Sequence, residues 1–261
     1  MTTNDPEAMP SAFAAGASKA ERLADALRGD IATGRLPRGS SLPSEVEIMA
    51  QHSVSRPSYR EAIRLLEAEG LVEVKRGVGG GARVLTPSMD PITSHFGVYL
   101  QTRSISMVQL FEARLTYEPS IAAGIAARRD HDALEHLARC AASQEFSIGN
   151  RPKFNEQERI FRRALIEHAD NLVIRAIGLM VDDVFNRHME NISRWLPTPE
   201  YERAHLEDGV RAKHLLVRLM ADGEVLRAER AWRVYIRVYL RRLINVVGRD
   251  YAIEAYPRDG G

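Results

Sequence analysis

The side chains best suited to contact another molecule lie close together in the N-terminal quarter of the chain, at Ser55, Arg56 and Arg60. Ser55 is a helix-capping residue and Pro57 is tolerated in a first helical turn, so a helix is predicted to begin there. Arg56 and Arg60 would lie one turn apart on the same helix face. An arginine fork donates two hydrogen bonds to guanine O6 and N7, the commonest specific contact of proteins with DNA. The spacing therefore predicts that this helix end reads duplex DNA.

A second group of basic and small residues follows shortly afterwards. Lys75 and Arg76 precede Gly77, and three further glycines occupy 79–81. A glycine-rich tip lets the backbone approach a duplex closely, and we expect Arg76 to enter the minor groove. For any single arginine, a solvated surface is an equally good interpretation. The combination of spacing, cap signals and hairpin is what favours DNA binding.

Three predicted helices position this surface. Leu23, Leu27 and Ile31 recur every four residues and indicate the first helix. Ser44 and Glu47 match a capping box, in which the serine caps one backbone N–H and the glutamate caps another, so a second helix should begin after Ser44. The third helix is the one that carries the two arginines.

A change of hydrophobic period follows the third helix at Gly70, from 3.6 residues to 2. Residues 71–74 and 82–85 are predicted strands, joined by the glycine-rich turn. Helix, helix, turn, helix and hairpin in this order make a winged helix-turn-helix, with a two-stranded β-hairpin as its wing. We place this domain at 18–87, after a flexible tail at 1–17.

The rest of the chain is predicted to be all helical. A proline-containing linker at 88–91 marks a domain boundary. Amphipathic runs then cover 92–249 without a convincing strand, which indicates a bundle of six or seven helices. A short tail is expected at 250–261. The predicted fold class is therefore mostly α, with a winged helix-turn-helix followed by an all-α domain.

Composition limits the classes of function. The chain has 261 residues, 44% of them hydrophobic and 27% charged, which is typical of globular proteins. The net charge of +1 does not argue for nucleic acid, because a DNA-binding protein needs local rather than total basic charge. The single cysteine, Cys140, can form neither an internal disulfide nor a zinc finger. No secretory signal or membrane-spanning stretch is visible, so we expect a cytoplasmic protein without membrane contact.

Catalytic motifs are missing from the sequence. It contains no nucleophile elbow, phosphate-binding glycine loop, His-Glu metal helix or pair of catalytic carboxylates. Enzyme activity in the helical domain is therefore the least favoured alternative. A DNA-binding repressor or architectural factor without any effector is the other alternative.

Residues 36–84 resemble the GntR family of bacterial regulators. The resemblance is carried by Leu42-Pro43-Ser44-Glu45, Val54-Ser55-Arg56-Pro57, Arg60-Glu61-Ala62-Ile63 and Leu66-Glu67-Ala68-Glu69-Gly70-Leu71-Val72. It implies a homodimer on a short palindromic operator of double-stranded DNA. The DNA contacts that we expect are Ser44, Ser55, Arg56, Arg60, Arg76 and Gly77. Some members carry a basic residue after the Pro-Ser-Glu motif, where this chain has Val46, so one contact is in doubt.

The helical part, about 92–248, resembles the FadR branch of that family, with its ligand-binding FCD-type domain. The similarity rests on Arg114 and Glu118, Ala122-Ala123, Phe161, Leu165, Asn171, and Gly223 with Ala228. Many FCD domains bind a divalent metal through one Asp and three His. Carried over to this sequence, those positions fall on Glu158, Arg162, Lys213 and Tyr235. Arginine and lysine donate hydrogen bonds and repel cations, so neither a metal nor another cofactor is expected.

The same positions suggest a pocket for an anion. We predict effector binding by Arg114, Glu118, Glu158, Arg162, Lys213 and Tyr235, through charge-assisted hydrogen bonds. The Gly-Gly-Gly-Ala-Arg-Val segment at 79–84 resembles actinobacterial fatty-acid regulators, which favours an acyl-CoA or a carboxylate catabolic intermediate as the effector. A buried salt-bridge network without a ligand role is the alternative. The predicted function is a transcription repressor that leaves its operator when the effector binds.

Overall fold

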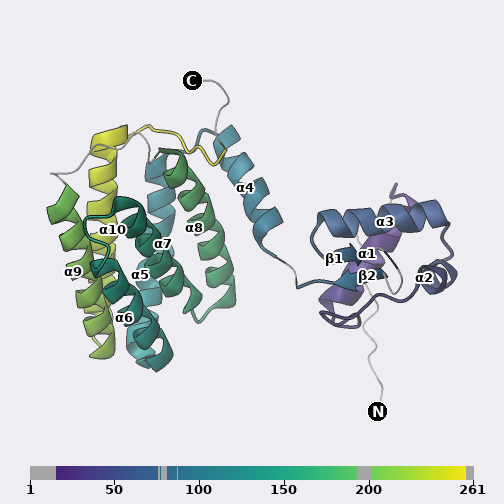
Figure 1. Ribbon diagram of the computed structural model, residues 1–261, viewed down its shortest axis with the longest axis horizontal. Helices are drawn as coiled ribbons and strands as arrows, with labels where there is room; N and C mark the ends of the chain where they lie inside the picture. Colours follow the sequence, from purple (N-terminus) through teal and green to yellow (C-terminus); the bar gives the residue numbers. More distant parts are fainter. Residues whose placement is uncertain (1–15, 76, 78–80, 87, 193–201, 257–261) are drawn as a thin grey trace, which may run out of the picture. The chain divides into compact units, whose positions relative to one another are not determined.

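The computed structural model describes residues 16–75, 77, 81–86, 88–192 and 202–256. The chain divides into two compact units, 1–91 and 92–261, and each unit is described by itself. Figure 1 shows that the first unit combines helices with a hairpin and that the named elements in the described part of the second are all helices.

The described residues of the N-terminal unit form three complete helices and a hairpin, namely α1 (Lys19–Ala32), α2 (Glu45–His52), α3 (Arg56–Ala68), β1 (Val72–Lys75) and β2 (Gly81–Val84). Complete capping boxes start α1 at Ser18 and α2 at Ser44. The two helices α1 and α3 pack together around a core that includes Leu23, Leu27, Ile48 and Leu66. This arrangement confirms the predicted winged helix-turn-helix (Figure 1).

The hairpin is fixed to the helices by the segment that follows α1. The strands are antiparallel, with Val72 opposite Val84. Backbone N–H groups of Gly39 and Leu42 donate to carbonyls of β2 at 2.8 Å each. The Arg83 side chain returns a hydrogen bond from Nε to the Gly39 carbonyl at 2.7 Å. These hydrogen bonds therefore hold the base of the wing against the segment that follows α1.

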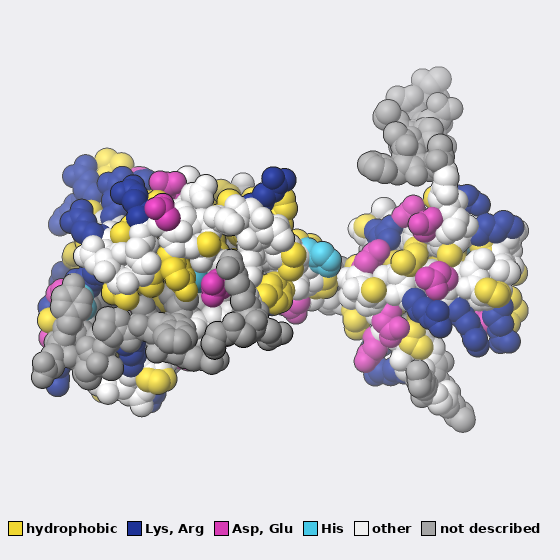
Figure 2. Space-filling view, turned by 90° about the horizontal axis from the view of Figure 1, so that it is seen from above, with side chains coloured by type: hydrophobic (Ala, Val, Ile, Leu, Met, Phe, Trp, Pro, Cys, Tyr) yellow, Lys and Arg dark blue, Asp and Glu magenta, His cyan; other side chains and the backbone are white. Residues whose placement is uncertain are grey.

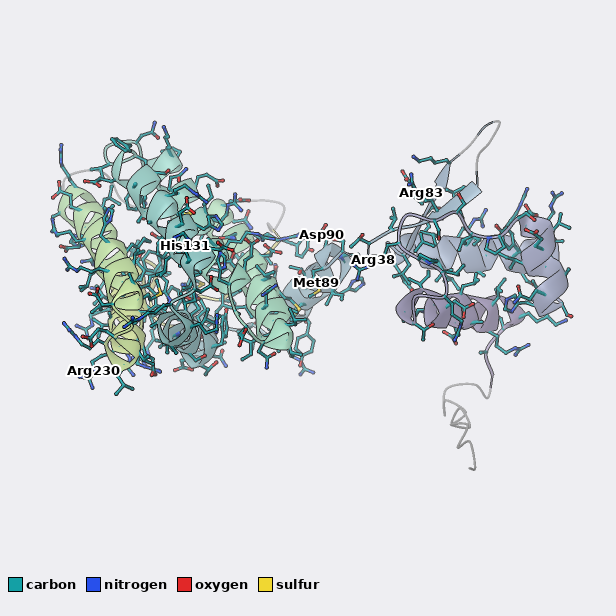
Figure 3. The ribbon with its side chains drawn as sticks, turned by 90° about the horizontal axis from the view of Figure 1, so that it is seen from below. Arg38, Arg83, Met89, Asp90, His131 and Arg230 are labelled. Carbon is teal, nitrogen blue, oxygen red and sulfur yellow. The ribbon has the colours of Figure 1, made fainter. Side chains whose placement is uncertain are left out.

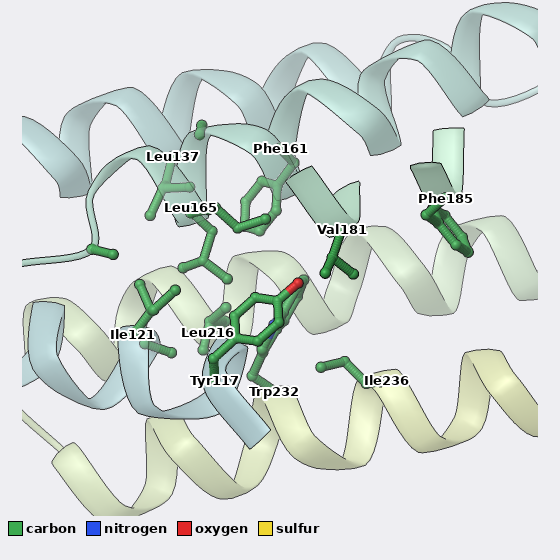
Figure 4. Packing of buried hydrophobic residues seen from close by; sticks show 14 of the residues in the cluster. Tyr117, Ile121, Leu137, Phe161, Leu165, Val181, Phe185, Leu216, Trp232 and Ile236 are labelled. Atoms are coloured by element: carbon green, nitrogen blue, oxygen red, sulfur yellow. The ribbon is translucent and has the colours of Figure 1, made fainter. Parts of the chain in front are cut away.

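Seven helices follow in the described residues, in line with the six or seven predicted for the second domain. They are α4 (Asp90–Thr102), α5 (Met107–Arg128), α6 (His131–Glu145), α7 (Arg151–Glu167), α8 (Leu172–Ile192), α9 (Glu202–Ala221) and α10 (Val225–Val247). Helix α5 packs along α10 and also contacts α7, α8 and α9. The core between them contains Phe161, Leu216 and Trp232 (Figure 4). The described helices confirm the all-α prediction.

The segment after α10 differs from the tail expected at 250–261. Ile253 is completely buried, and Ala255 is buried as well. The backbone N–H of Ile253 donates to the carbonyl of Ile105 at 2.8 Å, which places this segment against the start of α5. A segment this short has no hydrophobic period to detect, so only the folded structure reveals that it belongs to the core.

None of the helices in the described ranges combines the length and the apolar character that a bilayer crossing needs.

Candidate functional site

The N-terminal end of α3 presents the predicted DNA-contacting side chains to solvent. Ser55 is the N-cap, and its Oγ accepts a hydrogen bond from the Ser58 N–H at 3.4 Å. Arg56 and Arg60 are both exposed, whereas the opposite face of the helix buries Ala62, Ile63 and Leu66. Figure 2 shows further Lys and Arg side chains on the surface of this unit. The helix is therefore anchored by its apolar face and offers its polar end to a partner.

Arg56 is held by a residue of the preceding helix. Its Nε donates to Glu45 Oε1 at 2.6 Å. This hydrogen bond and the negative charge of Glu45 raise the pKa of Arg56. The contact uses the Nε side of the guanidinium, and within the described residues neither Nη atom has a hydrogen-bond partner. Sequence reasoning included Glu45 in the family resemblance but gave it no role.

Ser44 uses its hydroxyl in the cap of α2. Its Oγ accepts from the Glu47 N–H at 3.3 Å and donates to Glu47 Oε2 at 2.8 Å, which lowers the pKa of Glu47. Val46, beside it, is 71% exposed. Gly77 has a φ of +108°, a conformation that favours glycine. The predicted contact at Arg76 falls outside the described residues.

The six predicted effector residues lie together in the interior of the C-terminal unit. Five are buried, and Tyr235 is half-buried. Arg114 Nε donates to Glu118 Oε1 at 2.6 Å, and Trp232 Nε1 donates to the other oxygen of Glu118 at 2.8 Å. The guanidinium of Arg114 also lies over the rings of Phe111 and Phe185, so it is enclosed by aromatic side chains.

Glu158 is the centre of the second half of this group. It accepts hydrogen bonds from Lys213 Nζ at 2.5 Å, from Tyr235 Oη at 2.7 Å and from Gln144 Nε2 at 2.8 Å. Lys213 Nζ also donates to Tyr235 Oη at 2.9 Å. Burial alone would raise the pKa of Glu158, but the Lys213 charge and the hydrogen bonds from Lys213 and Gln144 lower it to about 2. Glu158 is therefore ionised at neutral pH.

Arg162 pairs with α8, which the sequence reasoning did not foresee. Its guanidinium donates to Asp182 and Asn186 and lies over the Phe185 ring, 4.5 Å from the centroid. Asp182 is almost completely buried. A charged residue on the buried face of an amphipathic helix is the signal that could have identified it.

These contacts form what we call the charge network, which is electrically balanced. It consists of the cations Arg114, Arg162 and Lys213 and the anions Glu118, Glu158 and Asp182. Each cation is paired with one carboxylate. An entering anion would have to displace an existing ion pair to bind inside it, and breaking a buried pair is costly.

A metal ion does not fit the side chains at the positions carried over from FCD domains. The ammonium of Lys213 already lies against Glu158 and Tyr235, and Arg162 is a second cation. In the described part of the chain, no three His, Cys, Asp or Glu side chains are grouped closely enough to ligate a metal. His214, the neighbour of Lys213, is exposed and lies 3.3 Å from Glu145.

A cavity of about 810 Å³ lies beside the charge network, between α7, α9 and α10, and Met189 of α8 also belongs to its wall. Glu158 and Tyr235 belong to both the network and the cavity wall. The wall is mostly apolar and includes Phe154, Met189, Leu206, Leu215, Leu219, Val234, Val238 and Leu243. A volume of this size is typical of small-molecule sites.

Arginines give this cavity an excess of positive charge. Arg151, Arg227, Arg230 and Arg242 line it, against the two acids Glu158 and Asp208. Asp208 is paired with Arg242 at 3.2 Å, Arg227 is paired with Glu224 at 3.4 Å, and Glu158 is paired inside the network. Arg230 is exposed at the outer surface of the unit, and no partner is found for it within the described residues (Figure 3). The cavity is therefore suited to a ligand that combines an apolar part with negative charge.

Comparisons with known proteins agree on both units. Residues 19–81 match the model of the GntR family of bacterial regulatory proteins, and residues 109–238 match that of the FCD domain. The chain is 30% identical over 166 residues to the HTH-type transcriptional repressor NanR of Cronobacter sakazakii, and 31% identical over 148 residues to that of Shigella sonnei. These matches cover 62% and 56% of this chain.

The chain spans only part of the length of the curated relatives that it matches. The chain spans 63% of the Cronobacter sakazakii protein and 56% of the Shigella sonnei protein. A solved structure of a Streptococcus agalactiae GntR protein aligns with a TM-score of 0.62 at 23% identity, covering 85% of this chain and 99% of that one. At this level of identity the structural likeness shows a shared fold.

Proposed function

Because the chain belongs to the GntR family of bacterial regulatory proteins and carries an FCD domain, we propose that it is a transcription repressor controlled by a small anionic effector. The observation that supports DNA binding is the exposed end of α3, with Ser55, Arg56 and Arg60 at the surface. Helix-turn-helix proteins insert this end of the helix into the major groove. Repression is supported by the relatives from Cronobacter sakazakii and Shigella sonnei, both of which are transcriptional repressors.

We also propose that the protein is cytoplasmic and acts as a homodimer on a palindromic operator. Two recognition helices related by a twofold axis would bind half-sites one turn of DNA apart. The expected contacts are Ser44, Ser55, Arg56, Arg60, Arg76 and Gly77. Because Ser44 Oγ already serves the cap of α2, a contact there would add to the capping hydrogen bonds.

The effector, in this proposal, occupies the cavity beside the charge network. The network residues already pair with one another, whereas the cavity offers about 810 Å³ of open volume. Glu158 and Tyr235 belong to the cavity wall and would contact the uncharged part of the ligand, because the ionised Glu158 repels negative charge. Arg114, Glu118, Arg162 and Lys213 would hold that wall in place. An acyl-CoA, or a carboxylate with an apolar body, matches the apolar wall and the arginine excess.

Release from DNA requires that the effector distinguish two states of the protein. A ligand that binds both states equally shifts nothing, however tightly it binds. The effector must therefore bind the DNA-free state more tightly, by about 1.4 kcal/mol for each tenfold loss of operator affinity. The cavity lies between helices that pack on α5, so a ligand there can favour one packing arrangement.

The DNA-binding part is tested by selecting duplexes from a random pool with the full chain. Replacing Arg60 by alanine should weaken binding to the selected duplex by about 1–3 kcal/mol and relax the preference at one base pair. Arg237→Ala, which removes an exposed arginine of α10, is the matched control and should change neither. Unchanged affinity and preference in Arg60→Ala would show that α3 is not the reading helix.

The effector part is tested by thermal shift with carboxylates and acyl-CoAs of increasing chain length. A ligand should raise the unfolding temperature and release the selected duplex. Arg230→Ala should weaken the binding of that ligand more than Arg237→Ala does. If no compound stabilises the protein or releases DNA, the effector part fails. The remaining function is then a repressor or architectural factor without a ligand.

A further inference from the structure

Glu45 and Arg56 connect the first turns of α2 and α3. The distance from Arg56 Nε to Glu45 Oε1 is 2.6 Å. The Glu45 side chain is 29% exposed, whereas that of Arg56 is 67% exposed. The acid is therefore seated partly among its neighbours, while the arginine reaches outward from it. An arginine at the start of a helix would otherwise sample many rotamers.

The geometry of the guanidinium group determines which of its N–H donors this contact uses. Arginine carries five N–H donors in a planar fork, and a carboxylate can engage the Nε side. The two Nη atoms then remain available at the end of the side chain, where they have no partner among the described residues. A bidentate contact to guanine O6 and N7 needs two N–H groups held in one plane. Ordering that plane before binding reduces the entropy lost on binding.

We propose that Glu45 is a positioning residue for DNA reading. Its carboxylate holds the guanidinium plane of Arg56 so that the Nη end faces the base edges, and it thereby sets the preference at one base pair. This role rests on the proposed DNA-binding function. The Glu45 carboxylate also has an unfavourable effect. An anion near the duplex repels the phosphates and weakens sequence-independent binding.

The two effects of Glu45 have opposite signs, and a merely structural role would not produce that pattern. Losing the carboxylate should reduce binding to the selected duplex and increase binding to a random duplex. A loss of folding would reduce both. Glu61 is a suitable control, because it is an exposed glutamate of α3 that pairs with Arg64 at 3.4 Å and not with Arg56.

The experiment measures anisotropy of labelled duplexes with the full chain, at several salt concentrations. Glu45→Ala should reduce the ratio of selected to random affinity at least about fivefold. Binding to the random duplex should rise about twofold. Glu61→Ala should leave the ratio unchanged. In an Arg56→Ala background, Glu45→Ala should cause no further loss of the ratio, since the two residues act together.

Three results would overturn the role of Glu45. One is an unchanged ratio in Glu45→Ala. Another is an equal fall in affinity for both duplexes, which would indicate a structural role. The third is an undiminished effect in the Arg56→Ala background. If the wild-type chain selects no duplex at all, the proposed function fails as well, and this outcome is distinct from the other three.

Discussion

Lys213 Nζ lies 2.5 Å from Glu158 Oε2 in the interior of the C-terminal unit. Lys213 is completely buried, and Glu158 is 8% exposed. The ammonium also lies over the Tyr235 ring, 4.5 Å from its centroid. A cation that belongs to the protein therefore stands among the positions where many FCD domains hold a metal. This pair has consequences for stability, for pH dependence and for metal binding.

Replacing Lys213 by methionine should lower the free energy of unfolding by about 3–5 kcal/mol, because it leaves the Glu158 carboxylate buried without a counter-ion. Urea unfolding at pH 7 measures this. The double variant Lys213→Met with Glu158→Gln should recover part of the loss. Lys153→Met, at an exposed lysine of α7, should have little effect. Additive losses in the double variant would contradict the coupling.

Acid should remove the stabilisation that the ionised Glu158 provides. Its folded pKa of about 2 lies below its ordinary value, so the folded state resists protonation. The contribution is therefore complete above about pH 4.5 and is lost as the pH falls towards 2; it amounts to roughly 3 kcal/mol. The unfolding free energies of wild type and Glu158→Gln should converge between pH 5 and pH 2.5. A constant difference would contradict the lowered pKa.

His188 should make the protein sensitive to a milder acid range. Burial lowers its pKa to about 4, and its Nδ1 accepts the Glu254 N–H at 2.8 Å. Because the folded pKa is below the ordinary one, stability is complete above about pH 6.5 and falls as the pH decreases towards 4. His188→Asn should flatten the dependence of unfolding temperature on pH. His131→Asn, at an exposed histidine, should keep the wild-type slope.

Metal analysis tests directly whether the protein binds a metal ion despite Lys213. Protein purified without a chelator should contain no stoichiometric zinc or nickel, because Lys213 and Arg162 are cations among the carried-over ligand positions. Addition of EDTA should leave the unfolding temperature unchanged. A stoichiometric metal whose removal lowers that temperature would show that another arrangement of ligands operates.

Replacing Val46 by arginine should increase the affinity for DNA. It is 71% exposed on the first turn of α2, next to Glu45. Val46→Arg should add a phosphate contact, raise affinity at low salt and steepen the dependence of log K on log salt by about 0.9 per protomer. Val173→Arg, at an exposed valine of α8, is the control. An unchanged salt slope in Val46→Arg would place this side chain away from the duplex.

Local interactions explain why the N-terminal unit could be predicted from its sequence. The capping box of Ser44 and Glu47 joins residues three positions apart. The change of the hydrophobic period from 3.6 residues to 2 after Gly70 likewise indicates the hairpin within a few residues. Such patterns depend on the neighbouring sequence alone, so the helix starts, the wing and the exposed position of Arg56 and Arg60 follow from it.

Tertiary packing decided the character of the helical unit. The resemblance grouped Glu158 with Lys213, which are 55 positions apart, but did not show that they pair with each other. Asp182 completes the charge balance from α8, and Ile253 enters the core from beyond the last helix. Which charges neutralise one another, and where a cavity is left beside them, depends on how the helices pack. The helical period determines which face of each helix is buried, and only the fold determines what that face meets.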